Sequence, residues 1–225
     1  MTKNLPANLA ILPMAQQALW PHLRHIPDAG FILYGGTAIA LRLGHRQSID
    51  FDFFSDRSLD KADIIKAFPL AAKSTSLQDR DNTWVMLVSG SQEESVKVSF
   101  FGALDFGRVG EPELTQDGVL QVASLDDLMA TKVKVILQRA EAKDYRDIAA
   151  MVNAGVSLSR GLASARLLFG PNFQASESLK ALVYFNDGDL NTLTETEKNT
   201  LVNAVKSIVK LPSVNLRSSR LSDML

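Results

Sequence analysis

The sequence contains no cysteine, and this absence excludes disulfide bonds and zinc sites that depend on thiolate ligands. Histidine is scarce as well, and three residues are too few for a typical zinc cluster. Neither sign of charge dominates, because the formal net charge is −1, so the composition does not indicate binding to nucleic acid. An RNA-binding role would therefore require a local positive patch.

Long apolar runs are also missing. The sequence shows neither a cleavable signal nor an apolar run of about 20 residues, the length that spans a bilayer, so we expect a cytoplasmic protein with no membrane partner. Hydrophobic residues make up 46% of the 225 residues, which is enough to build a sizeable core. The composition predicts a soluble chain of one domain, or of one domain with a helical extension.

One segment, residues 31–55 with the sequence FILYGGTAIALRLGHRQSIDFDFFS, holds a pair of glycines and a pair of aspartates. The apolar run 31–34 predicts a buried strand, and the two glycines after it allow the backbone to turn sharply. Good helix formers then predict a short helix over 37–43 that ends at Gly44. Alternation with a period of two residues predicts another strand over 49–54.

The aspartates of this segment are Asp50 and Asp52, which share one face of the predicted strand, while Phe51 and Phe53 share the other. Two carboxylates about 6.5 Å apart at Cα can converge on a hard cation such as Mg²⁺. Unpaired N–H groups at a helix start bind phosphate oxygens. The segment thus indicates a site for a metal-bound nucleoside triphosphate. The alternative is a solvated strand face beside an ordinary turn.

This pattern resembles the signature of the AbiEii/AbiGii-toxin family of nucleotidyltransferases, within the DNA polymerase β-like superfamily. The resemblance is carried by GGT at a helix start and by RQSIDFDF after the helix, that is, by Gly35, Gly36, Thr37, Arg46, Ser48, Asp50, Phe51, Asp52 and Phe53. It implies Mg²⁺-dependent (or Mn²⁺-dependent) transfer of a nucleoside monophosphate from an NTP, with tRNA or a protein as a possible acceptor and a separate antitoxin as a possible partner. It further implies that Asp50 and Asp52 are catalytic metal ligands, and that the other polar and glycine positions bind the nucleotide.

In that superfamily a third carboxylate commonly stands on the strand after the paired aspartates. The matching stretch here is VKVSF at 96–100, and Ser99 occupies the place where an aspartate would be expected. Two hypotheses therefore stay open. One is a toxin that acts as a nucleotidyltransferase, with two carboxylates at its metal site or with another acid in place of Ser99. The other is a non-catalytic NTP-binding regulatory or interaction protein that retains the nucleotidyltransferase fold.

A second motif lies in the helical part of the chain, where Lys132 and Arg139 precede the KDxxD run that contains Asp144 and Asp147. This arrangement resembles the second conserved block of the same toxin family. The resemblance implies that Lys132 contacts the triphosphate and that Asp144 acts near the reacting hydroxyl or positions Lys132. Local ion pairs on a solvated helix surface are the alternative.

The predicted fold class is α+β. We expect a small mixed sheet flanked by helices over 1–123, which the resemblance identifies as a nucleotidyltransferase core, and a helical region over 124–225 that completes the active site. In the first part we also predict a helix over 58–68 capped by Ser58, a hairpin of strands 83–88 and 96–101 joined by the polar link 89–95, and a strand over 119–123.

The helical region is predicted to begin with a helix opened by a capping box of Ser124 and Asp127. Further helices are predicted over 158–169, 175–185 and 195–210, and a capping box of Thr194 and Glu197 opens the last of them.

Overall fold

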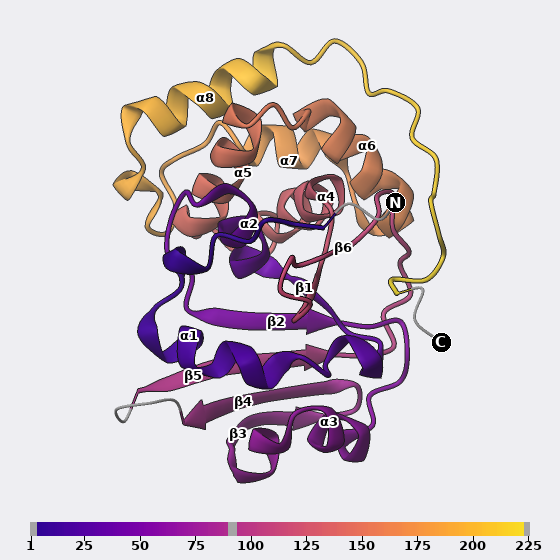
Figure 1. Cartoon of the computed structure of the whole chain (residues 1–225). Helices are drawn as coiled ribbons and strands as arrows, with labels where there is room; N and C mark the ends of the chain where they lie inside the picture. The colour runs from indigo at the N-terminus through magenta and orange to yellow at the C-terminus, as the bar shows by residue number, and fades with distance from the viewer. Residues whose placement is uncertain (1–3, 90–93, 223–225) are drawn as a thin grey trace. The chain divides into compact units, whose positions relative to one another are not determined.

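The computed structural model describes residues 4–89 and 94–222 (Figure 1). Contacts between residues divide this part of the chain into two units. The first comprises the described residues of Met1–Gly107, Glu111–Ala123 and Ser218–Leu225, and the second comprises Arg108–Gly110 and Ser124–Arg217. The chain therefore leaves the first unit and returns to it near its end, where the N–H of buried Leu221 donates to Asp56 Oδ1 at 2.9 Å.

The first unit contains a seven-stranded mixed sheet, in the order β3-β4-β5-β2-β1-β7-β6, which confirms the α+β fold class (Figure 1). The pairs β2/β5 and β1/β7 are parallel, and the remaining neighbours are antiparallel. The strands are β1 (Ile32–Tyr34), β2 (Asp50–Phe54), β3 (Thr75–Arg80), β4 (Thr83–Ser89), β5 (Ser95–Phe101), β6 (Glu113–Leu114) and β7 (Gln121–Val122), and the α-helices are α1 (Met14–Leu19), α2 (Gly35–Leu43) and α3 (Lys61–Ala67).

The core of this unit is aromatic around β2. Phe51 and Phe53 are fully buried, and Phe53 stacks on Phe100 of β5 with ring centroids 5.1 Å apart. Because side chains alternate along a strand, burial of the phenylalanines leaves Asp50 and Asp52 on the opposite, half-buried face. The predicted division of this strand into two faces is confirmed.

Helix α2 begins two residues before the predicted start, because Gly35 and Gly36 form its first turn instead of a separate turn. The helix ends at Gly44, as predicted, where a φ of 63° places this residue in the left-handed conformation. Arg42 in the last turn donates to the carbonyl oxygens of Val122 and Ala123. These bonds hold α2 against the strand β7.

The predicted cap of helix α3 was wrong, because Ser58 is not its N-cap. The helix starts at Lys61, and the Asp60 carboxylate caps it by accepting from the N–H groups of Ala62 and Asp63. Ser58 does not carry out this role, since an aspartate stands closer to the first amphipathic turn.

The predicted antiparallel hairpin is present, because β4 pairs with β5 throughout its length. Part of the predicted link between these strands, 90–93, lies outside the described residues. Strand β3 had no sequence prediction, because all of its residues are exposed and TSLQDR carries no apolar alternation. Its pairing with β4 is what makes it a strand.

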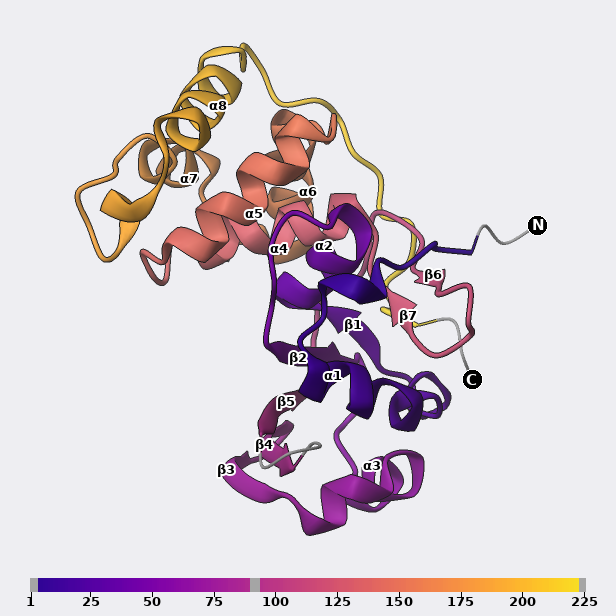
Figure 2. The same cartoon turned by 60° about the vertical axis from the view of Figure 1, so that its left-hand side comes forward.

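The second unit is helical (Figure 2). Its α-helices are α4 (Leu125–Val135), α5 (Ala142–Asn153), α6 (Leu158–Phe169), α7 (Ala175–Ala181) and α8 (Glu195–Lys206). Helix α6 has the predicted bounds, whereas α7 and α8 each end four residues earlier than predicted. The capping box of Thr194 and Glu197 is confirmed, because both of its hydrogen bonds are present.

At the start of α4 the predicted capping box is only half correct. Ser124 Oγ accepts from the N–H of Asp127, as an N-cap does. The Asp127 carboxylate instead accepts from the backbone N–H groups of Val109 and Gly110, so it ties residues 108–110 to the helical unit. Burial raises the pKa of Asp127, and these hydrogen bonds only partly oppose that effect.

Within the described residues, no helix combines the length and the apolar character that a membrane crossing demands.

Candidate functional site

In the first unit the structure brings the paired aspartates to the start of α2. Tyr34, the residue before this helix, pairs with Asp52 in the antiparallel register of β1 and β2. Gly35 follows with a φ of +72°, and a Cβ atom added to it would lie 2.5 Å from Asp52 Oδ2. Only glycine therefore fits here, because it permits both the left-handed backbone and the close approach of the carboxylate.

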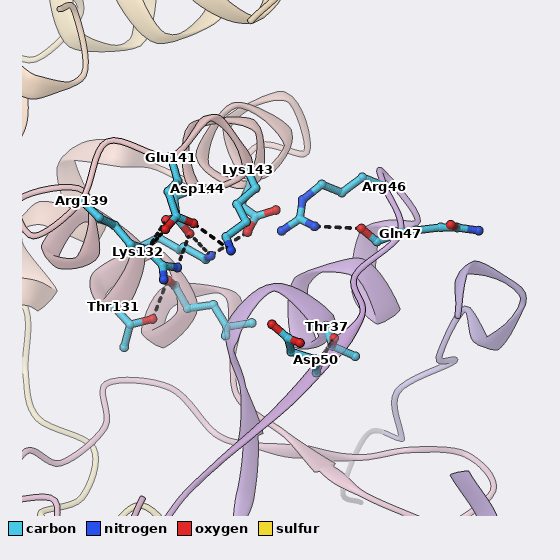
Figure 3. Close-up of polar contacts among 12 residues, drawn as sticks. Thr37, Arg46, Gln47, Asp50, Thr131, Lys132, Arg139, Glu141, Lys143 and Asp144 are labelled. Atoms are coloured by element: carbon cyan, nitrogen blue, oxygen red, sulfur yellow. Dashed lines mark hydrogen bonds and ion pairs between the residues drawn. The ribbon is translucent and has the colours of Figure 1, made fainter. Parts of the chain in front are cut away.

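The start of α2 carries backbone N–H groups that have no partner within the helix itself. Tyr34 is its N-cap and makes no side-chain capping bond. The Thr37 hydroxyl instead donates to the Asp50 backbone oxygen, which fixes the helix to β2 (Figure 3). Thr37 thus positions the two elements through its side chain and presents a backbone N–H group within the first turn.

Arg46 and Ser48 lie between α2 and β2. Arg46 Nη1 donates to the backbone oxygen of Gln47 at 2.8 Å (Figure 3). Ser48 is buried, with 8% of its surface exposed. In the sequence, Arg46 lies four residues and Ser48 two residues before Asp50.

The strand next to the aspartates lacks the third carboxylate. In the parallel register of β2 and β5, Asp50 is opposite Lys97 and Asp52 is opposite Ser99. Ser99 is buried, and Lys97 Nζ lies 2.8 Å from Asp50 Oδ2. The prediction that Ser99 stands beside the aspartates is confirmed. Lys97 was missed, because only the register of β2 with β5 reveals that it lies opposite Asp50.

The two carboxylates suit a hard divalent cation that is shared with a substrate. The described residues contain no group of three or more His, Cys, Asp or Glu that could hold a metal ion. Mg²⁺, however, is usually bound through one or two carboxylates together with waters and substrate phosphates. Asp50 and Asp52 supply oxygen donors from one half-exposed strand face and therefore fit this mode.

In the second unit, Lys132 of α4 and the KDxxD residues of α5 form a buried charge cluster. Lys132 Nζ lies 2.5 Å from Asp144 Oδ1 and 2.7 Å from Asp147 Oδ2. Both carboxylate side chains are fully buried, and the lysine side chain is 7% exposed. Ion pairs, which were predicted as the alternative, therefore exist, but those of Lys132 are buried and not on a solvated surface.

Arg139 adds a second cation to this cluster by donating to Asp144 Oδ2 at 2.8 Å (Figure 3). Burial alone would raise the pKa of Asp144, but the charges of Lys132 and Arg139 and their hydrogen bonds outweigh it and hold the pKa below its ordinary value. Asp144 is accordingly a carboxylate at neutral pH. Its two oxygens are bonded to these two cations, which is the geometry of a group that fixes a lysine in place.

The fold of the chain is that of nucleotidyltransferases. It superimposes on MenT4, a nucleotidyltransferase toxin from Mycobacterium tuberculosis H37Rv, with a TM-score of 0.52 and 13% identity over 83% of this chain and 81% of that one. It also superimposes on an antigenic nucleotidyltransferase-like protein from Paracoccidioides brasiliensis, with a TM-score of 0.52 and 16% identity over 88% and 96% of the two chains.

Comparison of the sequence with known protein families identifies the family of the chain. Residues 23–199 match the model of the family described as nucleotidyl transferase AbiEii toxin, type IV TA system, so the chain belongs to this family of nucleotidyltransferase toxins. An uncharacterized protein of Aquifex aeolicus (strain VF5) is 30% identical over 159 residues, which cover 70% of this chain and 74% of that protein.

Proposed function

We propose that this protein moves a nucleoside monophosphate from an NTP to a hydroxyl of an RNA, with tRNA as the first candidate, or of a protein, and that it does so with Mg²⁺ as the toxin of a toxin–antitoxin system. The observation that carries the proposal is the placement of Asp50 and Asp52 on one face of β2 beside the start of α2. Membership of the family supports the same reaction class.

Asp50 and Asp52 would hold the Mg²⁺ ion. When bound, the ion neutralises charge on the triphosphate and on the leaving pyrophosphate. Backbone N–H groups of Gly35, Gly36 and Thr37 would bind phosphate oxygens, because their donors point out of the helix start and the helix dipole favours negative charge. Arg46 and Ser48 are proposed as further nucleotide contacts on the strength of the family motif.

Lys132 and Asp144 are proposed as the catalytic pair of the helical unit, with Lys132 contacting the triphosphate. The buried contacts of Asp144 with Lys132 and Arg139 support a positioning role for this carboxylate over one as a proton acceptor. A lysine held by two carboxylates presents its ammonium in a defined direction, which suits the stabilisation of developing negative charge.

The reaction is a displacement at the α-phosphorus. The acceptor hydroxyl oxygen forms a bond to this phosphorus, and the bond from the phosphorus to the oxygen bridging the α- and β-phosphates breaks. Pyrophosphate leaves with the electron pair of that bond, and the hydroxyl proton passes to a base or to water. The product is a phosphodiester if the acceptor is an RNA or protein hydroxyl.

The experiment compares NTPs labelled at the α-phosphate with NTPs labelled at the γ-phosphate, in the presence of total bacterial RNA or protein, with Mg²⁺ or with EDTA. The expected result is an RNA or protein that carries the α-label, release of the γ-label as pyrophosphate, and loss of both with EDTA. Incorporation of the γ-label would indicate phosphoryl transfer and overturn the proposal. NTP binding without any transfer would support the non-catalytic alternative, which the buried Ser99 opposite Asp52 favours.

A Gly35→Ala variant tests the start of α2. We expect its affinity for the metal–NTP complex to fall at least about tenfold, because the new Cβ meets Asp52 Oδ2 at 2.5 Å and the left-handed backbone adds strain of about 1–3 kcal/mol. Calorimetric titration with each NTP in the presence of Mg²⁺ measures the affinity. Gly118→Ala is the matched control, since its φ of +70° produces the same strain with no atom within 4 Å of the new Cβ. Equal affinities in the two variants would contradict the proposed phosphate site.

A further inference from the structure

Lys97 contacts one of the proposed metal ligands from the neighbouring strand. In-register partners on parallel strands project to the same face of a sheet, so Lys97 shares the face of Asp50. Its Nζ lies 2.8 Å from Asp50 Oδ2. On β4, the partners of Lys97 and Ser99 are Leu87 and Val85, which carry no charge. The β5 lysine is therefore the charged neighbour that this register brings to Asp50.

This contact has little value for folding. The Lys97 side chain is 39% exposed and that of Asp50 is 27% exposed. Ion pairs that remain in contact with water typically contribute up to about 1 kcal/mol to stability. The buried face of the same strands, which carries Phe51, Phe53 and Phe100, holds the sheet together instead. A lysine beside a proposed metal ligand thus needs an explanation other than stability.

Its charge changes the electrostatics of the site. Asp50 and Asp52 repel each other when both are ionised, and an ammonium ion 2.8 Å from Asp50 offsets part of this repulsion before any cation binds. Where a third carboxylate would make the strand face more negative, Ser99 is neutral and Lys97 makes the face less negative. A bare divalent cation is consequently attracted less strongly than by three carboxylates, while a nucleoside triphosphate is repelled less strongly.

We propose that Lys97 is a positioning residue of the nucleotidyl-transfer site, which holds the Asp50 carboxylate before the cation arrives and makes the site select the metal–triphosphate complex over the bare cation. This inference rests on the proposed function. Its physical basis is that one positive charge has opposite effects on the binding of a bare cation and on the binding of a metal–triphosphate complex. It repels a divalent cation, whereas it attracts a metal–triphosphate complex, whose net charge is negative.

The test is a Lys97→Met variant, which keeps the length of the side chain and removes its charge. Titration with Mn²⁺ without nucleotide, followed by the electron paramagnetic resonance signal of free Mn²⁺, is expected to show about tenfold tighter binding than in the wild type. In transfer assays, the KM for the NTP is expected to rise about tenfold with a smaller change in kcat, because substrate attraction is lost. Lys97→Arg, which keeps the charge, should restore both values towards those of the wild type.

Lys61→Met is the matched control, because it removes another half-exposed lysine that is paired with an aspartate of the same unit, Asp79. It should leave both measurements unchanged. If Lys97→Met matches the wild type in Mn²⁺ affinity and in KM, or shifts both in the same direction, the role of Lys97 is refuted. If the wild type neither binds Mn²⁺ nor transfers label, the proposed function fails instead, and the two failures are therefore distinguishable.

Discussion

An Asp52→Asn variant is expected to transfer the α-label of an NTP about a thousandfold more slowly than the wild type. Asparagine has nearly the same size, so the contact with the start of α2 at Gly35 is retained in shape. The substitution removes one negative charge from the pair of carboxylates that is proposed to hold Mg²⁺, and stabilisation of the leaving pyrophosphate is lost with the cation. Label incorporation into RNA or protein measures the effect.

Asp79→Asn is the matched control for this substitution, because Asp79 is an exposed aspartate on β3, a strand that β4 and β5 separate from β2, and its carboxylate pairs with Lys61. Its transfer rate should equal that of the wild type. Expression should slow bacterial growth for the wild type and for Asp79→Asn but not for Asp52→Asn. Transfer by Asp52→Asn within threefold of the wild-type rate would exclude Asp52 as a metal ligand.

A Lys132→Met variant is expected to lower the free energy of unfolding of the helical unit by about 3–5 kcal/mol. The reason is that the buried Asp144 and Asp147 both lose an ammonium ion at 2.5 and 2.7 Å, and their charges stay buried without it. Arg139 still donates to Asp144 and limits the loss there. Urea denaturation followed by far-ultraviolet circular dichroism reports the helices, whereas the fluorescence of Trp20 and Trp84 follows the first unit.

Two further variants separate the charge effect from a simple loss of packing. Lys180→Met breaks an ion pair with Glu177 on exposed α7 and should cost less than about 1 kcal/mol. The double variant Lys132→Met/Asp147→Asn should be more stable than Lys132→Met alone, since one of the two buried charges has been removed. A double variant that is less stable than the single one would show that packing, and not unpaired charge, dominates.

Local patterns accounted for the elements that depend on few residues. The alternation of Asp50 to Phe53 predicts the two faces of β2, because successive side chains of a strand point to opposite faces of the sheet. The cap at Thr194 was predictable as well, because both of its hydrogen bonds join residues that are three apart in the sequence. The sequence also predicted that Gly35 lets the backbone turn sharply, but it did not predict how close this residue lies to Asp52.

Elements that depend on distant partners were not predictable in this way. Strand β3 is polar and exposed throughout, so its conformation follows from pairing with β4 and not from its own composition. Asp127 was expected to complete a local capping box, but backbone donors at Val109 and Gly110 bind its carboxylate. A buried carboxylate takes the donors that the tertiary fold offers, and sequence spacing does not reveal these.

The sequence by itself determined the motif residues, the faces of β2, the helical nature of the second unit and the membership of the AbiEii toxin family. Only the tertiary structure decided that Lys97 meets Asp50 and that Lys132 lies buried between Asp144 and Asp147. The physical reason is that the alternation of a strand and the cap of a helix depend on residues close in sequence. The energy of an ion pair depends instead on burial and on partners that only the packing of the chain brings together.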